Sequence, residues 1–182
     1  NLPLCFWKIE TDGSLRNNGR EFKTCAIPIC YAEAALTCLF KELNTTIDFS
    51  KRTSIHIHMD VRKFIPEQLL SFLMIYLTIE NLFFKFADTN RKTNIFCVPL
   101  MESNLLEIFG TGGATKNYFL ELLPNWRKYS ALNLLTVTSF GTVEFRHMSG
   151  TNNIAKILLW IDLINQIKLY AYKNSFKDIL KE

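Results

Sequence analysis

The sequence lacks the features that identify several large classes of protein. Its five cysteines are an odd number and include no Cys-X-X-Cys pair, so neither a complete disulfide framework nor a zinc ribbon is expected. We interpret them as free thiols in a reducing compartment. Lysine and arginine number 21 against 17 acidic residues but form no basic run, which disfavours a dedicated nucleic-acid binder.

No stretch of the sequence predicts a targeting signal or a membrane span. The segment from Asn1 to Leu4 has neither a basic region nor a long apolar run, both of which a secretory signal has. The most apolar segment, Leu69 to Leu77, is shorter than the roughly 20 residues that cross a bilayer. We therefore expect a cytoplasmic protein without a membrane partner.

What the sequence does contain is typical of a globular protein, and we expect a single domain over residues 1–182. Hydrophobic residues make up 48% of the chain and charged residues 21%, a composition that is neither disordered nor fibrous. The 15 phenylalanines favour a large apolar core, or a core together with an oligomer interface.

Periodicity predicts strands and helices that are interspersed along the chain. Strands are predicted at Leu4–Thr11, Arg20–Ile29, Thr53–Val61, Ala131–Thr138 and Thr142–Met148. Helices are predicted at Tyr31–Leu43, Pro66–Ala87, Ser103–Phe109, before Leu123, and from Asn152 to near Asn174. Because short turns join several strands, we predict an α+β fold with an antiparallel sheet.

Two of the predicted strands carry chemically active side chains on one face. Successive side chains of a strand point to opposite faces, so His56, His58 and Asp60 share a face of the first strand. By the same rule, Glu144 and Arg146 share a face of the second. Imidazole, carboxylate and guanidinium groups bind divalent metals and phosphate. We predict that the two faces meet in one site.

Each pair also has a purely structural interpretation. For His56 and His58 it is an edge strand with two solvent-facing histidines. For Glu144 and Arg146 it is a cross-strand salt bridge on a wet face, worth under about 1 kcal/mol. Charges kept in a covered cleft are usually functional, because leaving them unpaired there is costly. We therefore favour a functional site.

Three other segments are weaker candidates. Gly110–Thr115 lacks the Gly-Lys-Ser/Thr ending of a P-loop, so it is interpreted as a surface loop, with a lid over a ligand as the alternative. Trp126–Tyr129 interleaves aromatic and basic residues, a pattern of nucleic-acid binding, but one such tetrad is weak evidence. Asp12 and Ser14 are explained as turn residues.

Several fragments taken together resemble the amidoligase family, which is common in phages, prophages and some fungi. Trp7–Leu15 resembles its "w-x-x-x-x-D-G-S-l" opening, and Glu21–Thr24 its "E-h-x-S" strand with Thr in place of Ser. Ser54–His58 resembles its "G-x-H-V-H" strand with Ser in place of Gly. Lys128–Asn133 and Gly141–Arg146 match its "K-Y-x-A-L-N … G-T-V-E-F-R" block, so the resemblance covers nearly the whole chain.

This resemblance implies a fold and a reaction. The family is similar to the glutamine synthetase and glutamate–cysteine ligase superfamily. It implies a twisted, mainly antiparallel sheet backed by helices, of the glutamine synthetase/guanido kinase type, with the active site on the concave face. It also implies ATP- and Mg²⁺-dependent joining of a carboxylate to an amine through an acyl phosphate. The substrates would be small molecules or peptides, with a protein target as another option, and a phage-encoded member would act in the host cytoplasm.

The resemblance also implies roles for individual residues. Glu144 would hold Mg²⁺, Glu21 would supply a second metal carboxylate, and His56 would contact metal or phosphate. Arg146 would contact the γ-phosphate, since an acyl phosphate forms only if the charge on the transferred phosphoryl group is neutralised. The candidates for nucleotide binding are His58 and Lys128. The candidates for positioning the substrate are Tyr129, Asn133, Asp12 and Ser14.

One feature of the family is missing before Trp7, namely the strand of pattern G-x-E-x-E that supplies metal carboxylates. Glu10 lies on the wrong strand to replace it. Either an N-terminal segment lies outside this sequence or the metal site is incomplete. In the second case the protein would be a degenerate scaffold or a subunit that binds a host protein, because a shared fold does not imply a shared activity.

Overall fold

The computed structural model describes residues 7–13, 15, 19–43, 47, 49–102 and 123–174. The strands are β1 (Trp7–Thr11), β2 (Arg20–Thr24), β3 (Ser54–Asp60), β4 (Leu132–Asn133) and β5 (Thr142–Ser149). The helices are α1 (Ala32–Leu43), α2 (Pro66–Ala87), α5 (Thr136–Phe140) and α6 (Ile154–Lys173), with 3-10 turns η2 (Ile29–Tyr31), η3 (Thr89–Thr93), η4 (Leu100–Glu102) and η5 (Leu123–Asn125). The helices predicted at Ser103–Phe109 and before Leu123, and the Gly110–Thr115 loop, lie outside the described residues.

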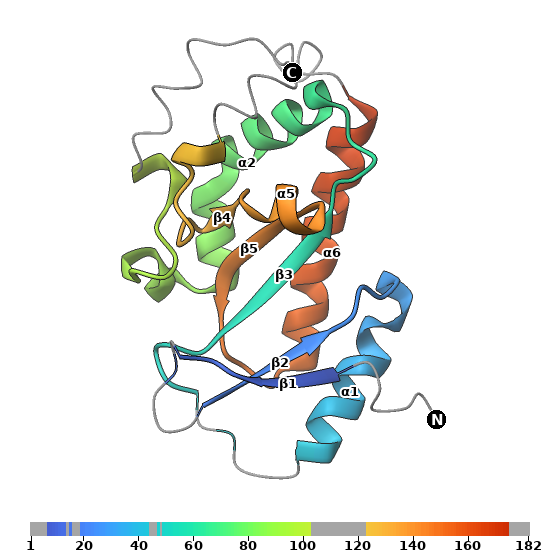
Figure 1. Ribbon diagram of the computed structural model, residues 1–182, viewed down its shortest axis with the longest axis vertical. Coiled ribbons are helices and arrows are strands. Elements are labelled where there is room, and N and C mark those ends of the chain that lie inside the picture. The colour runs from blue at the N-terminus through green and yellow to red at the C-terminus, as the bar shows by residue number, and fades with distance from the viewer. Residues whose placement is uncertain are drawn as a thin grey trace.

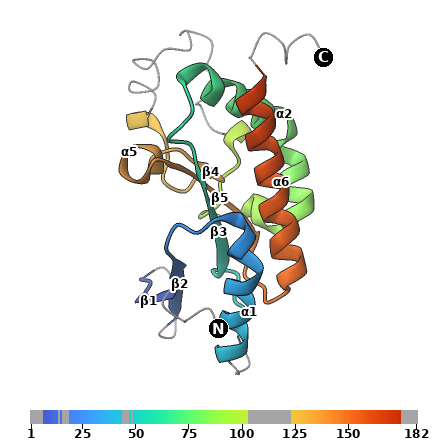
Figure 2. The ribbon, with the colours of Figure 1, turned by 90° about the vertical axis from the view of Figure 1, so that its right-hand side faces the viewer.

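The strands form two small antiparallel sheets, so the prediction of an α+β fold with antiparallel pairing is confirmed. The sheet β3–β5–β4 runs through the middle of the molecule with β5 at its centre, and the β1–β2 hairpin lies below it (Figure 1). Figure 2 shows α2 and α6 on one side of the three-stranded sheet, with α5 and the hairpin on the other side. The face opposite the two long helices is therefore the one that faces the viewer in Figure 1. The glutamine synthetase/guanido kinase type stays a prediction.

The long helix α2 has the bounds that the sequence predicts. Pro66 fits the first helical position, because its fixed φ suits the helix and its missing N–H would have no partner there. The Gln68 side chain accepts a hydrogen bond from the amide of Ile65 at 3.0 Å and so closes the first turn. Judged by length and composition alone, α2 is long and apolar enough to cross a membrane. Many of its side chains are buried in the hydrophobic core, so we interpret it as a core helix.

The core lies between α2, α6 and the helix-facing side of β5. Val143 and Phe145 of β5 are fully buried, in accordance with the predicted alternation along this strand. The aromatic rings of Phe145, Phe83 and Trp160 pack against one another with centroids 5.2 to 6.2 Å apart. This aromatic layer fixes the strand from behind and leaves the other face of β5 for polar side chains.

The β1–β2 hairpin is attached to this body through α1. Trp7 Nε1 donates a hydrogen bond to the carbonyl of Ala35 on α1 at 3.0 Å. Helix α1 in turn packs against α6, so the hairpin is held at the lower edge of the sheet. It is this attachment that brings the charged face of the hairpin near the open face of β5.

The strand predicted at Ala131–Thr138 is wrong beyond Asn133, because residues Thr136–Phe140 form the helix α5. The Asn133 side chain accepts a hydrogen bond from the amide of Leu135 at 3.0 Å and turns the chain away from the sheet. Gly141 ends the helix in a left-handed conformation with φ of 67°. Local bonds between side chains and backbone thus overcome the strand preference of the threonines and valine.

Gly141 is the residue at which we expect replacement by alanine to be costly. A left-handed conformation costs a residue with a Cβ about 1–2 kcal/mol, and a Cβ here would also press on the side chain of Arg62. We expect Gly141→Ala to lower the free energy of unfolding by about that amount in urea titrations. Gly13→Ala is the matched control, since a Cβ at Gly13 meets nothing within 4 Å and its φ is not positive. Equal effects of the two substitutions would contradict this account.

His147 is a fully buried histidine on the core side of β5. Its Nε2 lies 2.9 Å from the hydroxyl of Tyr76, and that hydroxyl donates its proton to Glu80 at 2.6 Å. Because the only hydroxyl proton of Tyr76 goes to Glu80, Nε2 of His147 must donate its own proton to the Tyr76 oxygen. The imidazole is neutral. Glu80 also accepts the amides of Leu100 and Met101, at 2.6 and 2.9 Å, so one network joins α2, β5 and η4.

The buried imidazole makes stability depend on pH. Burial, with a contribution from the charge of Arg91, lowers the pKa of His147 to about 3. The unfolded chain takes up this proton near pH 6.5, so the free energy of unfolding falls as the pH drops from about 6.5 towards 3. We expect His147→Phe to make this decline shallower in urea unfolding at pH 7.5, 6 and 5. A decline as steep as that of the native protein would show that His147 is not the group responsible.

Candidate functional site

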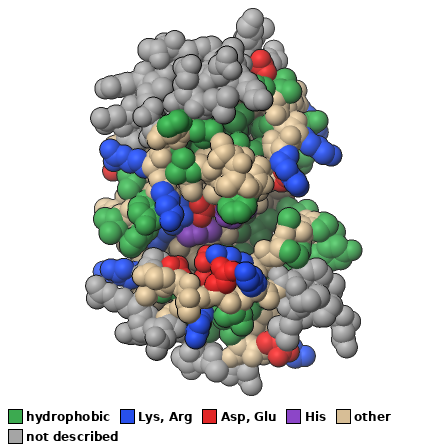
Figure 3. Space-filling view, viewed as in Figure 1, with side chains coloured by type: hydrophobic (Ala, Val, Ile, Leu, Met, Phe, Trp, Pro, Cys, Tyr) green, Lys and Arg blue, Asp and Glu red, His purple; other side chains and the backbone are tan. Residues whose placement is uncertain are grey.

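Glu144 is the centre of a polar cluster on the sheet face that α2 and α6 leave open. It lies on the central strand β5, directly opposite His58 of β3 on one side and Asn133 of β4 on the other. Figure 3 shows the exposed histidine side chains in a hollow across the middle of this face, beside acidic and basic side chains. Three neighbouring strands thus contribute to one site.

The carboxylate of Glu144 is buried and shared between three donors. Its Oε1 lies 2.8 Å from Nη1 of Arg146 and 2.9 Å from Nδ1 of His56, and its Oε2 accepts Nδ2 of Asn133 at 2.7 Å. The Nε2 of His58 is 4.0 Å from Oε1. Burial alone raises the pKa of Glu144, but the bonds and charges of His56, Arg146 and Asn133 outweigh it and lower that pKa to about 2. The carboxylate is therefore ionised at any physiological pH.

A bulge in the pairing of β3 with β5 lies beside His56 and Arg146 and sets the direction of these two side chains. Ile55 pairs with Met148 and Ile57 with Phe145, so two residues of β5 lie opposite the single residue His56. Such a bulge changes the alternation of side chains and is common beside active sites. Here Arg146 remains on the polar face while both residues after it are fully buried.

Both imidazoles of β3 are held by hydroxyl groups. Nε2 of His56 lies 2.8 Å from the hydroxyl of Ser54, and Nδ1 of His58 lies 2.9 Å from that of Thr142. Partial burial lowers the pKa of His58, and the negative charge of Glu144 opposes that shift. Because each ring has one nitrogen fixed by a hydroxyl, its other nitrogen is directed toward Glu144.

The guanidinium of Arg146 is fixed by three neighbours besides its position on β5. It donates to Glu144, and its Nε donates to the carbonyl of Phe96 at 3.1 Å. It also lies over the ring of Tyr129, 5.7 Å from the centroid. Arg91, which is only 2% exposed, donates through Nη2 to the backbone carbonyl of Arg146 at 2.9 Å. Arg146 thus has a single defined orientation, at the edge of the hollow.

The charged face of the β1–β2 hairpin lies on the other side of the hollow. Glu10 is opposite Glu21 and Lys8 is opposite Lys23 in the hairpin register, so like charges face each other. Ion pairs relieve this, with Glu10 bound to Lys8 of its own strand at 2.6 Å and to Lys23 of the other strand at 2.8 Å. Glu21 is bound to Lys23 of its own strand at 3.0 Å. Partial burial is the largest influence on the pKa of His58 and lowers it, while the charge of Glu21 is a smaller influence in the opposite direction.

Comparison with known protein families gives one match. The family model described as "Putative amidoligase enzyme" matches residues 2–168. The chain belongs to the amidoligase family. The match covers all five strands, α1, α2 and most of α6, and it indicates an enzyme that forms amide bonds. No curated protein and no solved structure shows a match to the chain.

In this chain the two sequence segments that were expected to share a site do meet. His56 and His58 lie 2.9 and 4.0 Å from the carboxylate of Glu144, so they do not only face solvent. Among the described residues β3 is an edge strand, as the structural interpretation supposed. The alternative for Glu144 and Arg146 holds in part, because the two side chains form an ion pair at 2.8 Å. The pair lies within one strand, however, and the residues are only 5% and 9% exposed, so it is not a cross-strand bridge on a wet face. The catalytic and nucleotide-binding roles of these residues stay predictions.

The other candidates from the sequence lie in different positions. Asn133 is a hydrogen-bond partner of Glu144, and Tyr129 lies beneath Arg146 with the ammonium of Lys128 5.7 Å from its ring centroid. Asp60 pairs with Arg62 at 2.8 Å at the far end of β3 and so serves a local structural role. Asp12 follows β1 in a turn, in which its backbone carbonyl accepts a hydrogen bond from the amide of Leu15 at 3.1 Å. Ser14 lies outside the described residues.

The predicted metal roles of Glu144, Glu21 and His56 find no support in the described part of the chain. There, no group of three or more His, Cys, Asp or Glu side chains could hold a metal ion. Glu144 already accepts three donors, Glu21 is bound to Lys23, and an imidazole is a poor ligand for Mg²⁺, which prefers oxygen. The carboxylates of Glu144 and Glu21 are thus already engaged by donors of the protein itself.

One of the two aromatic rings that suggested nucleic-acid binding by the segment Trp126–Tyr129 is not accessible. Trp126 is 3% exposed and its indole N–H donates to the carbonyl of Leu132 at 2.8 Å, so the ring belongs to the core. A ring that stacks on a base must be accessible, and Tyr129 alone meets that condition.

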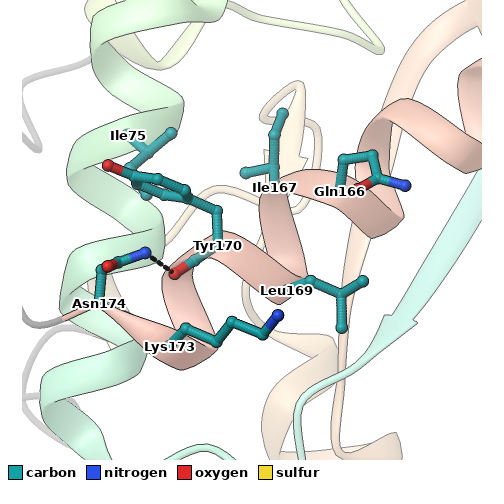
Figure 4. A pocket seen from close by; sticks show the side chains of 7 residues that line it. All are labelled: Ile75, Gln166, Ile167, Leu169, Tyr170, Lys173 and Asn174. Carbon is teal, nitrogen blue, oxygen red and sulfur yellow. Dashed lines mark hydrogen bonds between the residues drawn. The ribbon is translucent and has the colours of Figure 1, made fainter.

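A separate shallow pocket lies between α2 and α6, away from the Glu144 cluster (Figure 4). Its lining residues are Ile75, Gln166, Ile167, Leu169, Tyr170, Lys173 and Asn174. The Asn174 side chain donates to the carbonyl of Tyr170 at 2.9 Å and thereby caps the end of α6. None of the residues that contact Glu144 lines this pocket, so it is no part of the candidate site.

Several residues of the site were not identified from the sequence. Ser54 and Thr142 share the predicted faces with the histidines and Glu144, so the alternation itself was a signal for them. Phe96 takes part through its backbone carbonyl, which no side-chain pattern shows. The burial of Arg91 depends on how η3 packs against β5, which no pattern in the sequence shows.

We expect the amide of Asn133 to be essential for the ionised state of Glu144. Asn133→Asp would place a second carboxylate against Oε2, and two adjacent carboxylates cannot both ionise cheaply. The free energy of unfolding should fall by about 3 kcal/mol at pH 7.5 and by clearly less at pH 4.5, where one proton is shared. Asn153→Asp is the control, because that side chain caps the N-terminus of α6, where a carboxylate is favourable. A loss that does not change with pH would contradict the shared contact.

Proposed function

We propose that this amidoligase-family protein is an ATP-dependent carboxylate–amine ligase whose chemistry takes place at the Glu144 cluster. The observation that carries the proposal is the meeting of His56 and His58 with Glu144 and Arg146, from segments almost 90 residues apart, on one open sheet face. A buried ion pair flanked by two oriented imidazoles on rigid strands is an arrangement that positions charged reactants.

In the first step, a carboxylate oxygen of one substrate attacks the γ-phosphorus of ATP. An O–P bond forms, the bond to the β-phosphate oxygen breaks, and ADP leaves with the electron pair. Arg146 would stabilise the negative charge that is spread over the transferred group. Its hydrogen bonds to Glu144 and Phe96 use two of its five N–H groups and hold the guanidinium plane still.

In the second step, the amine attacks the acyl carbon and phosphate departs. The amine must lose a proton as the C–N bond forms, and His58, at the edge of the cluster, is our candidate to accept it. Glu144 would act through its neighbours, since it orients Arg146 and His56. Mg²⁺ that arrives with ATP would neutralise phosphate charge and be held chiefly by phosphate and water oxygens. The substrates would be a small-molecule or peptide carboxylate and amine in the cytoplasm, and the fold would be of the glutamine synthetase type.

A second candidate function follows from the chemistry of the described side chains. Since the described residues contain no three-ligand metal group, the protein could instead be a catalytically inactive member that binds another protein. Absence of any nucleotide binding, together with a stable complex with a partner protein, would favour this function over ligation.

The ligase proposal is tested by trapping the activated carboxylate. The native protein is incubated with ATP, Mg²⁺, hydroxylamine as the amine and a mixture of amino acids as carboxylates, and both ADP and hydroxamate are measured. We expect Glu144→Gln and Arg146→Ala to lower both products by about 100-fold or more, because an oriented charge is lost from the site. Glu67→Gln and Arg62→Ala, on the exposed surface, are controls and should keep full activity. Undiminished ADP formation in both site variants would refute the assigned roles.

A further inference from the structure

Three side chains on the polar face of the sheet form a hydrogen-bonded chain that we call the Ser54 triad, namely Ser54, His56 and Glu144. The hydroxyl of Ser54 lies 2.8 Å from Nε2 of His56, and Nδ1 of the same ring lies 2.9 Å from Oε1 of Glu144. A hydroxyl at Nε2 and a carboxylate at Nδ1 of one imidazole is the arrangement that activates a serine as a nucleophile. It recurs on unrelated folds, so it is identified by its geometry.

The carboxylate fixes which nitrogen of His56 carries the proton. Glu144 is ionised and can only accept, so Nδ1 of His56 donates to it. In the neutral ring Nε2 then has no proton and accepts the hydroxyl of Ser54. When this hydroxyl attacks a carbonyl group, its proton passes to Nε2, and the negative charge of Glu144 stabilises the imidazolium that forms.

The other imidazole of the site is arranged differently. Nδ1 of His58 lies 2.9 Å from the hydroxyl of Thr142, but its Nε2 is 4.0 Å from Oε1 of Glu144, which is too far for a hydrogen bond. The carboxylate thus fixes the tautomer of His56 and not that of His58. Of the two hydroxyl groups held by these imidazoles, that of Ser54 is therefore the one prepared to lose its proton.

The reacting end of the triad is accessible, whereas its carboxylate is not. Glu144 is buried, while the side chain of His56 is 24% exposed and Ser54 is half-buried. Figure 3 shows histidine side chains at the surface of this face, so a carbonyl group can approach from solvent. The low local dielectric around Glu144 strengthens its bond to the imidazole.

The backbone amide of Ser54 is directed to the outer side of β3. The amide of Gly150 donates to the carbonyl of Thr53 at 3.0 Å, so Ser54 and Ser149 form a non-hydrogen-bonded pair of the two strands. The backbone groups of such a pair point away from the partner strand. The amide of the attacking serine can therefore meet the carbonyl oxygen as that oxygen gains negative charge.

Membership of the amidoligase family does not imply this triad. The family strand that Ser54–His58 resembles has glycine at the position of Ser54, and glycine has no side chain that could attack a carbonyl group. The nucleophile is thus a feature of this chain.

We propose that Ser54 is the nucleophile of an acyl-transfer activity that needs no ATP, with His56 as its base and Glu144 as a positioning residue. The substrates would be activated acyl compounds, namely esters and acyl phosphates. This activity goes beyond the proposed function, although an acyl phosphate made by the ligase would be one of its donors.

The reaction takes place in two balanced steps. First, Oγ of Ser54 forms an ester bond to the acyl carbon, the bond from that carbon to the alcohol or phosphate oxygen breaks, and this oxygen leaves with the electron pair and the proton held by His56. Second, an amine or water attacks the ester and gives its proton to His56, and Ser54 recovers its hydroxyl as the amide or acid is released.

The first test is covalent labelling in the absence of nucleotide. The native protein is incubated with an alkyl fluorophosphonate, from which the hydroxyl of Ser54 displaces fluoride, and the label is located by mass spectrometry. We expect it on Ser54, and we expect Glu144→Gln to slow the reaction by about 100-fold or more, because the tautomer of His56 is no longer fixed. The matched control is Ser139→Ala, which removes an exposed serine of α5 and should be labelled on Ser54 as fast as the native protein.

The second test measures acyl transfer from p-nitrophenyl acetate, again without nucleotide. We expect a burst of p-nitrophenol and an acetyl group on Ser54 after acid quenching, because the ester with Ser54 forms before it is released. Ser54→Ala, shown by circular dichroism to be folded, should lose the burst. Hydroxylamine, acting as the amine, should take the acetyl group from the native protein as a hydroxamate.

The outcomes separate this inference from the proposed function. If the native protein carries neither the label nor the acetyl group on Ser54, or is labelled there no faster than urea-unfolded protein, Ser54 is not a nucleophile and only holds the ring of His56. ATP-dependent hydroxamate formation that requires Arg146 would then leave the ligase proposal standing. A label and an acetyl group on Ser54 without any ATP turnover would support the triad and refute the ligase.

Discussion

The buried carboxylate of Glu144 is the group on which the geometry of the site depends. Removing a carboxylate from water costs several kcal/mol unless its oxygens receive hydrogen bonds and an opposite charge. Each strand of the central sheet supplies one donor, His56 from β3, Asn133 from β4 and Arg146 from β5. The ionised group therefore joins the three strands on their polar face, and it fixes the two side chains most suited to chemistry.

The support for Arg146 comes from segments that are not strands at all. Arg91 from η3 reaches its backbone carbonyl, and the carbonyl of Phe96 receives its Nε. Tyr129, just before β4, lies beneath its guanidinium. An arginine held on several sides is preorganised, because little reorientation is needed when negative charge develops nearby. The irregular segments are thus as important for the site as the sheet that carries it.

Sequence patterns predicted the elements whose stability is local and the faces that follow from strict alternation. The helix from Pro66 to Ala87 has clear end signals, and the strands around His56 and Glu144 alternate as predicted except at the bulge opposite His56. The segment Ala131–Thr138 was predicted as a strand, but after Asn133 side-chain bonds to the backbone and the left-handed Gly141 favour a helix. The burial of Arg91 and the role of the Phe96 carbonyl arise only from tertiary packing, so no pattern in the chain could show them.

The hydrogen bonds that Glu80 accepts have a consequence for how mutations in this protein would be interpreted. Glu80 lies on the buried side of α2, yet it holds the amides of Leu100 and Met101, a few residues after the carbonyl that orients Arg146. A substitution in the helix core that moved this carboxylate would shift the chain leading to Phe96. Screens that sort variants into folding defects and catalytic defects by distance from the reacting groups would misassign such a change.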